Sequence, residues 1–312
     1  MKEFNRRDFF KVAGLCTGVC ALAPVAVAAD DAAPAVNDEQ FGMLYDATKC
    51  VGCKACMSAC KKTNNDNGNL QCDKARFDPD TKWDAPADLS GNNRTIIKLH
   101  KENSTTWSYV KYSCMHCQKP ACVSVCPVGA LTKDQKTGIV GYNKDFCIGC
   151  RYCQIGCPFN IPKFQWDRAI PQIVKCNFCK DTYFKTKGIT ACADVCPTKA
   201  ILFGKRGVLL AEAKRRLQES PGRYVQKIYG EKEVGGVNHL YLSGVPFEKL
   251  GLRALPEDAP PVFSEKIHHA IYKGFIAPIA LYSVLCFVAL RNMKKQKQVD
   301  AENSPAAGGG KA

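Results

Sequence analysis

Sixteen of the twenty cysteines in this chain fall into four groups of four, and their spacing constrains the fold more than any other feature of the sequence. Groups one and three follow the pattern C-x2-C-x2-C-x3-C, whereas groups two and four have a longer gap before the third cysteine. Cysteines two or three residues apart in a tight loop rarely meet disulfide geometry with each other, but they can all face one central ion or cluster. These quartets, numbered one to four, are Cys50, Cys53, Cys56, Cys60; Cys114, Cys117, Cys122, Cys126; Cys147, Cys150, Cys153, Cys157; and Cys176, Cys179, Cys192, Cys196.

The spacing of quartets one and three is typical of bacterial ferredoxins, which bind 4Fe-4S clusters, and Pro158 follows quartet three as in those proteins. Zinc is the alternative metal, because paired C-x2-C units are its common signature. However, three cysteines at two-residue spacing, with a fourth one helical turn later, place too many thiolates together for one tetrahedral ion. They suit a cubane cluster. We therefore expect four 4Fe-4S clusters, and a zinc-bearing, membrane-tethered binding module is the remote alternative.

The quartets must cooperate in pairs, because in two-cluster ferredoxins the fourth cysteine of each quartet ligates the cluster that the other quartet holds. Only twenty residues separate Cys126 from Cys147, so quartets two and three form one unit and quartets one and four pair around it. The stretch 126–131 (CPVGAL) recurs as 196–201 (CPTKAI), which supports this nesting, although Lys61 replaces proline after quartet one. The predicted ligand sets are Cys50, Cys53, Cys56 and Cys196 (site 1); Cys176, Cys179, Cys192 and Cys60 (site 2); Cys147, Cys150, Cys153 and Cys126 (site 3); and Cys114, Cys117, Cys122 and Cys157 (site 4).

This organisation predicts an α+β fold with two nested ferredoxin-like modules over residues 41–206, interrupted by a polar insert at about 61–113. A hairpin-like run through 136–140 (KTGIV) is expected to connect quartets two and three. Leucine and alanine at helical spacing predict a helix over 208–218, and Leu240 with Leu242 indicates a strand. These elements belong to a C-terminal extension and linker at 207–265, with several prolines near its end.

The N-terminus has the features of an export signal. Arg6 and Arg7, followed by Phe9 and Lys11, match the twin-arginine type, and an apolar run then leads to a small-residue cleavage site at Ala26-Val27-Ala28. We therefore expect residues 1–28 to be a signal peptide that delivers the chain to the periplasm.

A second apolar stretch lies near the C-terminus. The seventeen residues from Gly274 to Leu290 carry no charge, and a run of basic residues begins at Arg291. Roughly 17 to 25 apolar residues cross a bilayer, and the basic end stays in the cytoplasm. The sequence thus predicts a transmembrane helix at 270–290, a cytoplasmic tail at 291–312 and a body on the periplasmic side of the bacterial inner membrane. A buried core helix is the alternative.

The formal net charge of +15 would usually suggest nucleic acid or an anionic membrane surface as a partner. Four oxidised clusters with their thiolates would bring negative charge that offsets most of this excess, so we expect no nucleic-acid partner. The basic residues beside the cysteines are interpreted as counter-charges, with an ordinary solvated side chain as the alternative for each; they are Lys54, Lys61, Lys119, Arg151, Lys175 and Lys199.

Four cysteines stand outside the ligand sets, and three of the five histidines occupy positions that suggest a role. Cys16 and Cys20 leave with the signal, Cys286 lies in the predicted span, and Cys72 lies in the insert with no assigned role. His116, between two ligands, is interpreted as a spacer, with a hydrogen bond to cluster sulfur as the alternative. His268 and His269 lie where the C-terminal helix begins, and two roles stay open for them: a structural role, or contact with a quinone or a haem. The body has no nucleophile motif, phosphate-binding glycine loop or open metal position with a base, so no catalytic residue is predicted.

Nine stretches of the chain are similar to the four-cluster, ferredoxin-like electron-transfer subunits of membrane-bound respiratory complexes. They are GMLYDATKCVGCKAC, YSCMHC, CVSVCPVGAL, TGIV, CRYC, CPFNIPK, IYGEKEVGG, SGVPFE and YKGFIAP. Within that family the chain resembles the hydrogenase-2 operon type of iron–sulfur subunit. Formate dehydrogenase iron–sulfur subunits carry similar C-terminal stretches, but a twin-arginine signal of its own favours the hydrogenase type.

This resemblance implies a relay and no enzyme activity of the chain alone. Electrons from H2 oxidation would arrive from the small subunit of a NiFe hydrogenase, which works with a large subunit, and would pass along the four clusters. An integral membrane subunit that reduces quinone would accept them, with the chain itself in contact with membrane lipid. The same relay in a formate dehydrogenase or molybdenum oxidoreductase is the alternative.

Overall fold

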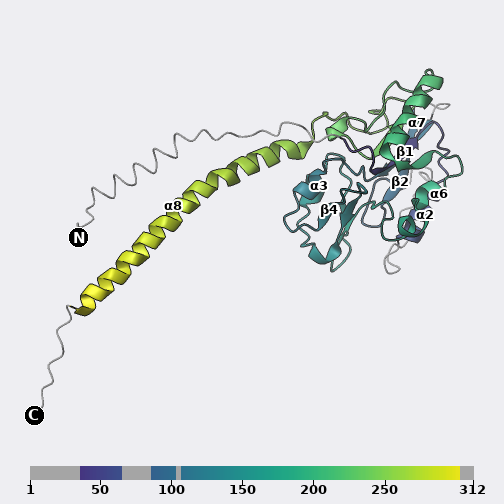
Figure 1. The fold of residues 1–312 in the computed structure, drawn as a ribbon. Helices are drawn as coiled ribbons and strands as arrows, with labels where there is room; N and C mark the ends of the chain where they lie inside the picture. Colours follow the sequence, from purple (N-terminus) through teal and green to yellow (C-terminus); the bar gives the residue numbers. More distant parts are fainter. Residues whose placement is uncertain (1–35, 65–85, 103–106, 303–312) are drawn as a thin grey trace, which may run out of the picture. The chain divides into compact units, whose positions relative to one another are not determined.

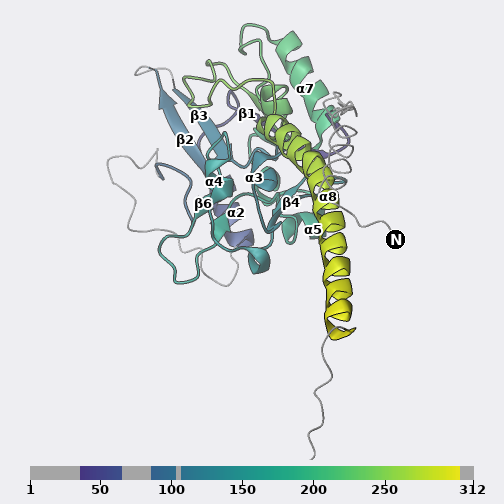
Figure 2. The same cartoon turned by 90° about the vertical axis from the view of Figure 1, so that its left-hand side faces the viewer.

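The computed structural model describes residues 36–64, 86–102 and 107–302, and within the long C-terminal helix it leaves some side chains undescribed. Residues 36–262 belong to one unit, and the residues from Phe263 onward belong to another. Each unit is described by itself. Figures 1 and 2 show the helices and strands in two views.

A three-stranded sheet with the order β8-β1-β9 forms the centre of the first unit. The central strand β1 (Phe41–Asp46) runs antiparallel to β8 (Ile201–Lys205) and parallel to β9 (His239–Leu242). The strand that precedes quartet one therefore pairs directly with the strand that follows quartet four. The Leu240–Leu242 strand predicted from sequence is confirmed, and it is part of the core sheet, although the sequence placed it in an extension.

The helices that carry the cysteines contact each other in two pairs. Helix α2 (Ala55–Thr63) contacts α6 (Ala191–Asp194), and α3 (Ala121–Ser124) contacts α4 (Tyr152–Ile155). Strands β4 (Leu131–Lys133) and β5 (Val140–Tyr142) form the expected hairpin between quartets two and three. Quartets one and four thus meet around β1 and β8, while quartets two and three meet beside the β4–β5 hairpin.

The predicted polar insert contains a buried hairpin that composition alone did not indicate. Strand β2 (Thr95–Lys101) pairs antiparallel with β3 (Trp107–Ser113), and Ile96, Ile97 and Val110 from this hairpin are buried in the core. Polar residues dominate the part of the insert before residue 95, whereas both strands contain apolar side chains that reach the core. The insert is therefore a structural part of the first unit.

The remaining elements are short, apart from α7 (Arg206–Glu219), which confirms the helix predicted over 208–218 and packs on β1, β8 and β9. Figure 1 shows it beside β1. The others are the 3-10 turns η4 (Lys144–Phe146) and η5 (Glu233–Gly235), the strands β6 (Lys163–Phe164) and β7 (Ile173–Val174), and α5 (Tyr183–Lys187).

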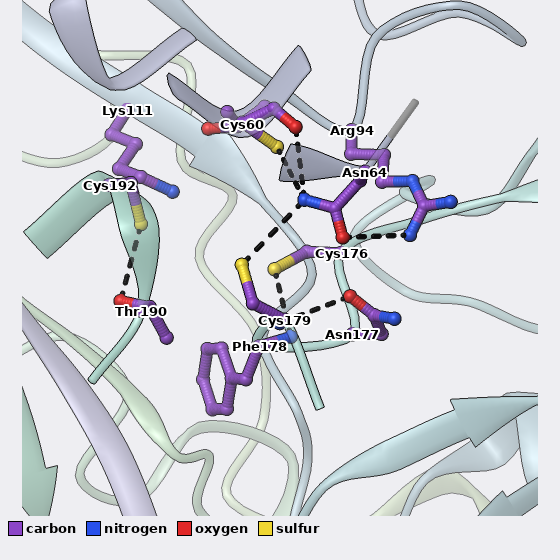
Figure 3. A pocket seen from close by; sticks show the side chains of 11 residues that line it. Cys60, Asn64, Arg94, Lys111, Cys176, Asn177, Phe178, Cys179, Thr190 and Cys192 are labelled. Atoms are coloured by element: carbon purple, nitrogen blue, oxygen red, sulfur yellow. Dashed lines mark hydrogen bonds between the residues drawn. The ribbon is translucent and has the colours of Figure 1, made fainter. Parts of the chain in front are cut away.

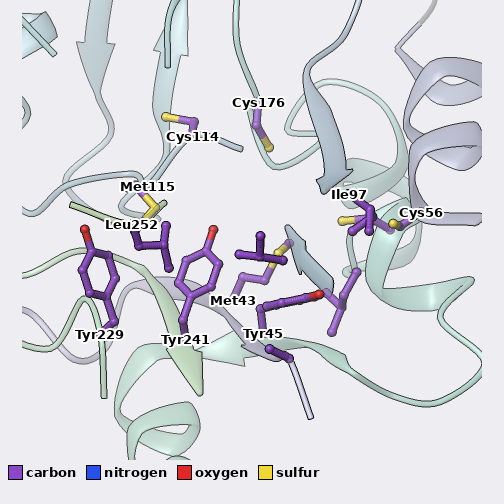
Figure 4. Packing of buried hydrophobic residues seen from close by; sticks show 14 of the residues in the cluster. Met43, Tyr45, Cys56, Ile97, Cys114, Met115, Cys176, Tyr229, Tyr241 and Leu252 are labelled. Carbon is purple, nitrogen blue, oxygen red and sulfur yellow. The ribbon is translucent and has the colours of Figure 1, made fainter. Parts of the chain in front are cut away.

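The largest core cluster mixes apolar side chains with cysteines (Figure 4). Tyr45, Ile97 and Tyr241 pack in the same cluster as Cys56 and Cys114. A smaller cluster joins Cys122 and Cys153 to residues of β4, β5, β6 and β7. The thiols therefore lie within the hydrophobic core, where exclusion of water lowers the local dielectric response.

Helix α8 (Pro260–Glu302) begins at one of the prolines that the sequence assigned to a linker, and from Phe263 onward it makes up the described part of the second unit. No helix in the part of the chain that the structure describes combines the length and the apolarity that a membrane crossing requires. The span predicted at 270–290 falls within α8, and this finding gives it no support.

Candidate metal centres

Left-handed backbone conformations bend each quartet loop so that its thiols converge. In quartet one Gly52 has φ +68° and Lys54 has φ +57°, and in quartet three Gly149 and Arg151 repeat this pair with +72° and +64°. A Cβ atom on Gly52 would lie 2.3 Å from the Tyr109 ring, so only glycine fits there. Quartets two and four achieve the same bend with non-glycine residues at positive φ; these are His116, Phe178 and Cys179.

Site 1 lies between the quartet-one loop and the end of α6. Cys50, Cys53 and Cys56 line a cavity together with Cys196, and the cavity has an empty volume of about 320 Å³. Tyr45 from β1 and Thr198 line the same cavity, and Thr198 Oγ1 lies 3.8 Å from Cys196 Sγ. Cys53 is exposed, whereas Cys56 and Cys196 are buried. The structure therefore brings the four predicted ligands of site 1 together.

Site 2 joins Cys60 from α2 to Cys176, Cys179 and Cys192 around a second cavity of about 300 Å³ (Figure 3). Asn64 Nδ2 lies 3.6 Å from Cys179 Sγ and 3.7 Å from Cys60 Sγ. Arg94 Nη1 donates to Asn64 Oδ1 at 3.4 Å, which holds the amide with its N–H groups toward the sulfurs. All four thiols of site 2 are buried. Hydrogen bonds from N–H groups stabilise negative charge on buried sulfurs, and this favours the binding of a negatively charged cluster through the thiolates.

Site 3 lies on the quartet-three loop and α4. Burial and then the nearby thiols of Cys147, Cys126 and Cys150 together raise the pKa of Cys153 to about 11, so these four side chains are neighbours. Tyr142 from β5 hydrogen-bonds to Cys147. The Arg151 guanidinium stacks over Trp166 at 4.8 Å, which gives this predicted counter-charge an aromatic partner as well.

Site 4 is formed by quartet two and the last cysteine of quartet three. The pKa of Cys117 lies well above its usual value because the thiol is buried and because Cys157, Cys114 and Cys122 are close to it. Lys133 Nζ donates to the backbone oxygens of Cys117 at 3.2 Å and Gln118 at 2.7 Å. The structure therefore also groups the predicted ligands of site 4.

Thiols of different sets are neighbours at three points. Beyond the effect of burial, Cys192 of site 2 is close enough to Cys56 of site 1 to raise the pKa of that thiol, and Cys176 of site 2 does the same for Cys114 of site 4. Cys153 of site 3 contributes in the same way to the raised pKa of Cys122 in site 4. Successive sites in the order 1, 2, 4, 3 are therefore neighbours, which the sequence alone did not predict.

The chemistry of the thiols fits 4Fe-4S clusters. Burial, with a smaller contribution from neighbouring thiols of the same set, raises the pKa of Cys56 and Cys122 to about 12 and that of Cys153 to about 11. Four such thiols lose their protons together only when positive charge lies between them, and the iron of a cluster supplies that charge. In the described part of the chain, no three or more His, Cys, Asp or Glu side chains are gathered to hold a single metal ion.

Two buried lysines accompany these sites, and sequence reasoning identified one of them. Lys175, predicted as a counter-charge, is buried, and it lowers the pKa of Cys114, Cys122 and Cys157 against the larger effect of burial. Lys111 on β3 is fully buried and lines site 2, and it was missed because it lies in the predicted polar insert, although Cys114 follows three residues later. Lys199, by contrast, is exposed.

His116 is fully buried and stacks on Phe178 with ring centroids 3.7 Å apart. Its Nδ1 accepts from Val140 N at 3.0 Å, so the ring proton is on Nε2, which has no hydrogen-bond partner. The ring thus packs between quartets two and four, and both predicted roles stay open. Arg6, Arg7 and Cys72 lie outside the described residues, as do the side chains of His268 and His269, and Cys286 is exposed on α8.

Comparison with known proteins agrees with this geometry. Residues 105–206, which hold quartets two to four, match the model of the 4Fe-4S dicluster domain. The chain is 38% identical to hydrogenase-2 operon protein HybA of Escherichia coli O157:H7, over 93% of this chain and 96% of that protein. It is 31% identical to the iron–sulfur subunit of the nitrate-inducible formate dehydrogenase of Escherichia coli K12, over 77% and 79%, and 31% identical to protein NrfC of the same strain, over 70% and 87%.

These matches confirm the resemblance seen in the sequence and the 4Fe-4S character of a ferredoxin-like domain with mixed helices and strands. The specific catalytic partner is not identified by them, because hydrogenase and formate dehydrogenase relatives both match over most of the chain. The chain belongs to the family of iron–sulfur electron-transfer subunits of oxidoreductase complexes that includes hydrogenase-2 operon protein HybA.

Proposed function

We propose that this chain relays electrons through four 4Fe-4S clusters, from a periplasmic NiFe hydrogenase to a membrane subunit that reduces quinone. The observation that carries the proposal is the grouping of sixteen thiols into four neighbouring sets in the order 1, 2, 4, 3. A cluster, when bound, exchanges one electron at a time with its neighbours. The two nested ferredoxin-like modules correspond to sites 1 and 2 and to sites 3 and 4.

The protein's part in this relay is to hold the ligands still and keep water away. Left-handed residues fix the quartet loops, and most of the thiols lie in the core. The Asn64 amide and the buried Lys111 and Lys175 are placed to stabilise negative charge on the sulfurs. A rigid, dry ligand shell needs little rearrangement when charge moves, which favours rapid transfer.

The hydrogenase assignment draws on the 38% identity to HybA over almost the whole chain. A formate dehydrogenase or molybdenum oxidoreductase complex is the second candidate, because the formate dehydrogenase subunit matches over 77% of the chain. Purification of the intact complex in detergent, followed by identification of the co-purifying subunits, distinguishes the two. Co-purification of the large and small subunits of a NiFe hydrogenase with an integral membrane subunit supports the first candidate. Co-purification of a molybdenum enzyme refutes the first candidate and supports the second.

We further propose that the chain works in the periplasm. The twin-arginine pathway moves folded proteins, so the clusters would be assembled in the reducing cytoplasm before export, and their thiolates would already be occupied in the oxidising compartment. Replacing Arg6 and Arg7 with lysine should leave cluster-loaded protein in the cytoplasm. Normal export of that variant contradicts this location.

Attachment to the inner membrane through residues 270–290 is the last part of the proposal. The sequence supports this attachment through the uncharged run from Gly274 to Leu290 and the basic residues after it. Among the described residues, no helix has the length and apolarity of a membrane span. Carbonate extraction of membranes at high pH tests it with the full chain. Retention in the pellet is expected when the partner subunits are deleted, and release into the supernatant refutes the anchor.

The iron–sulfur content is tested on protein purified without air. Four clusters require about 16 irons and 16 sulfides per chain, with EPR signals of reduced 4Fe-4S clusters at low temperature. A colourless protein that contains zinc instead of iron supports the zinc-binding alternative and refutes the relay.

A further inference from the structure

We propose that Lys111 is a cation shared by sites 1 and 2, and that its charge raises the reduction potentials of both clusters. The inference rests on the proposed binding of clusters at these two sites. It concerns a residue that acts on potential and makes no bond to iron.

Lys111 lines site 2 and is one hairpin partner away from the lining of site 1. On the side of site 2 it lines the cavity together with Cys60, Cys176 and Cys192, and Figure 3 shows it among these side chains. On the side of site 1, its partner across the β2–β3 hairpin is Ile97, which lines the site 1 cavity. Lys111 is fully buried, and its Nζ donates to Ser113 Oγ at 2.7 Å.

Lys111 is close enough to thiols of both sets to act on them electrostatically; they are Cys56 in site 1 and Cys60 and Cys192 in site 2. Lys175 is the comparison case beside site 4. It acts in the same way on Cys114, Cys122 and Cys157, which all belong to site 4, and its Nζ also donates to the backbone oxygen of Cys176 at 3.1 Å.

No carboxylate of the residues that the structure describes lies within 4.0 Å of Lys111 Nζ, and Ser113 Oγ is its hydrogen-bond acceptor. Burying an ammonium without a counter-ion costs several kcal/mol, so a compensating negative charge has to be close. The four thiolates of a bound cluster provide it at either site. The same lysine then stabilises the more negative, reduced form of each cluster, and this raises both potentials.

The experiment is a potentiometric EPR titration of the full chain carrying Lys111→Met, purified without air, beside wild type and Lys175→Met. We expect two of the four midpoint potentials to fall in Lys111→Met while the other two keep their wild-type values. In Lys175→Met we expect one midpoint potential to fall. It should belong to one of the two clusters whose potentials do not change in Lys111→Met. Four unchanged potentials in a Lys111→Met protein with full iron overturn the proposal, and so does a shift of a single cluster.

Loss of clusters from Lys111→Met is also informative. Loss of about 8 of 16 irons, with the thiols of sites 1 and 2 newly open to alkylation, agrees with a cation shared by those two sites. Loss from all four sites means a structural role and overturns the proposal. Lys111→Gln, which can still donate to Ser113, separates the charge from the hydrogen bond, and the same two potentials should fall in it. If wild type itself lacks about 16 irons, the proposed function fails before Lys111 is tested.

Discussion

Arg216 Nη1 on α7 donates to Asp46 Oδ2 at the end of β1, at 2.8 Å, and this ion pair lies four residues before Cys50. Asp46 is fully buried and also accepts from Tyr224 Oη at 2.9 Å and from Thr48 Oγ1 at 2.7 Å. Three groups therefore fix the carboxylate from which the quartet-one loop starts. The segment after quartet four, expected as an extension, thus positions the first ligands of site 1.

Replacing Arg216 with leucine should lower the free energy of unfolding by about 3–5 kcal/mol, because it leaves the buried Asp46 carboxylate without its cation. Arg215→Leu is the matched control on the same helix. Arg215 is exposed and pairs with Glu212 and Glu219, so its loss should cost far less stability than the loss of Arg216. Urea unfolding followed by tryptophan fluorescence measures both. Equal losses in the two variants would show that the Arg216–Asp46 pair has no special role.

Sequence patterns predicted the helices and strands that are formed by residues close together in the chain. The helical spacing after residue 207 appears as α7, and the connection between quartets two and three appears as the β4–β5 hairpin. The repeat of Cys-Pro-x-x-Ala after quartets two and four also corresponds to a repeated geometry, because Gly129 and Lys199 both have positive φ. Cysteine spacing alone was sufficient to propose sets of thiols that the structure places near one another.

The features that sequence missed depend on contacts between distant residues. Nothing local to Leu240 indicates that β9 pairs in parallel with β1, about two hundred residues earlier. Lys111 lies between Tyr109 and Ser113 in a segment of polar composition, where a lysine is usually solvated. Its burial becomes favourable only because the fold brings thiols of two sites toward it. The Asn64 amide at site 2 could not be recognised either, since its orientation depends on Arg94 thirty residues later.

The Asn64 amide should raise the potential of the site 2 cluster alone. Its Nδ2 approaches Cys179 Sγ and Cys60 Sγ, and hydrogen bonds to the sulfurs stabilise the reduced form. Asn64→Leu should therefore lower one midpoint potential in an EPR titration, and Asn64→Asp should lower the same one further because it adds negative charge. Gln226→Ala, which changes an exposed amide, is the control with four unchanged potentials. A fall of several potentials in Asn64→Leu would mean that the substitution disturbs more than site 2.

The stability that Glu212 contributes should depend on pH. Hydrogen bonds from Arg215 and then from Arg216 outweigh the opposing effect of burial and lower the pKa of this carboxyl from 4.5 to about 2. Because the pKa is depressed in the folded state, the contribution is complete above the unfolded value of about 4.5 and is lost as the pH falls from there toward 2. The difference in stability between wild type and Glu212→Gln should thus be larger at pH 7 than at pH 4. Unfolding curves at the two pH values check this, and a difference that grows on acidification contradicts the assignment.

The ligand sets can be tested by counting iron in double variants. If Cys196 belongs with quartet one, Cys196→Ser and Cys50→Ser each remove the cluster of site 1, and the protein keeps about 12 of 16 irons in either case. The two substitutions combined should also leave about 12 irons, because they remove the same cluster. Cys196→Ser combined with Cys176→Ser should leave about 8, because Cys176 belongs to site 2.

The opposite pattern would show that each quartet binds a cluster by itself. In that case Cys196 and Cys176 would share one cluster, so their double variant would keep about 12 irons and the Cys196/Cys50 double variant about 8. Cys286→Ser, on α8 outside all four sets, controls for the effect of losing a thiol and should keep the full iron content. The structure favours the first pattern, because Cys196 lines one cavity with Cys50, Cys53 and Cys56, while Cys176 lines the other with Cys60.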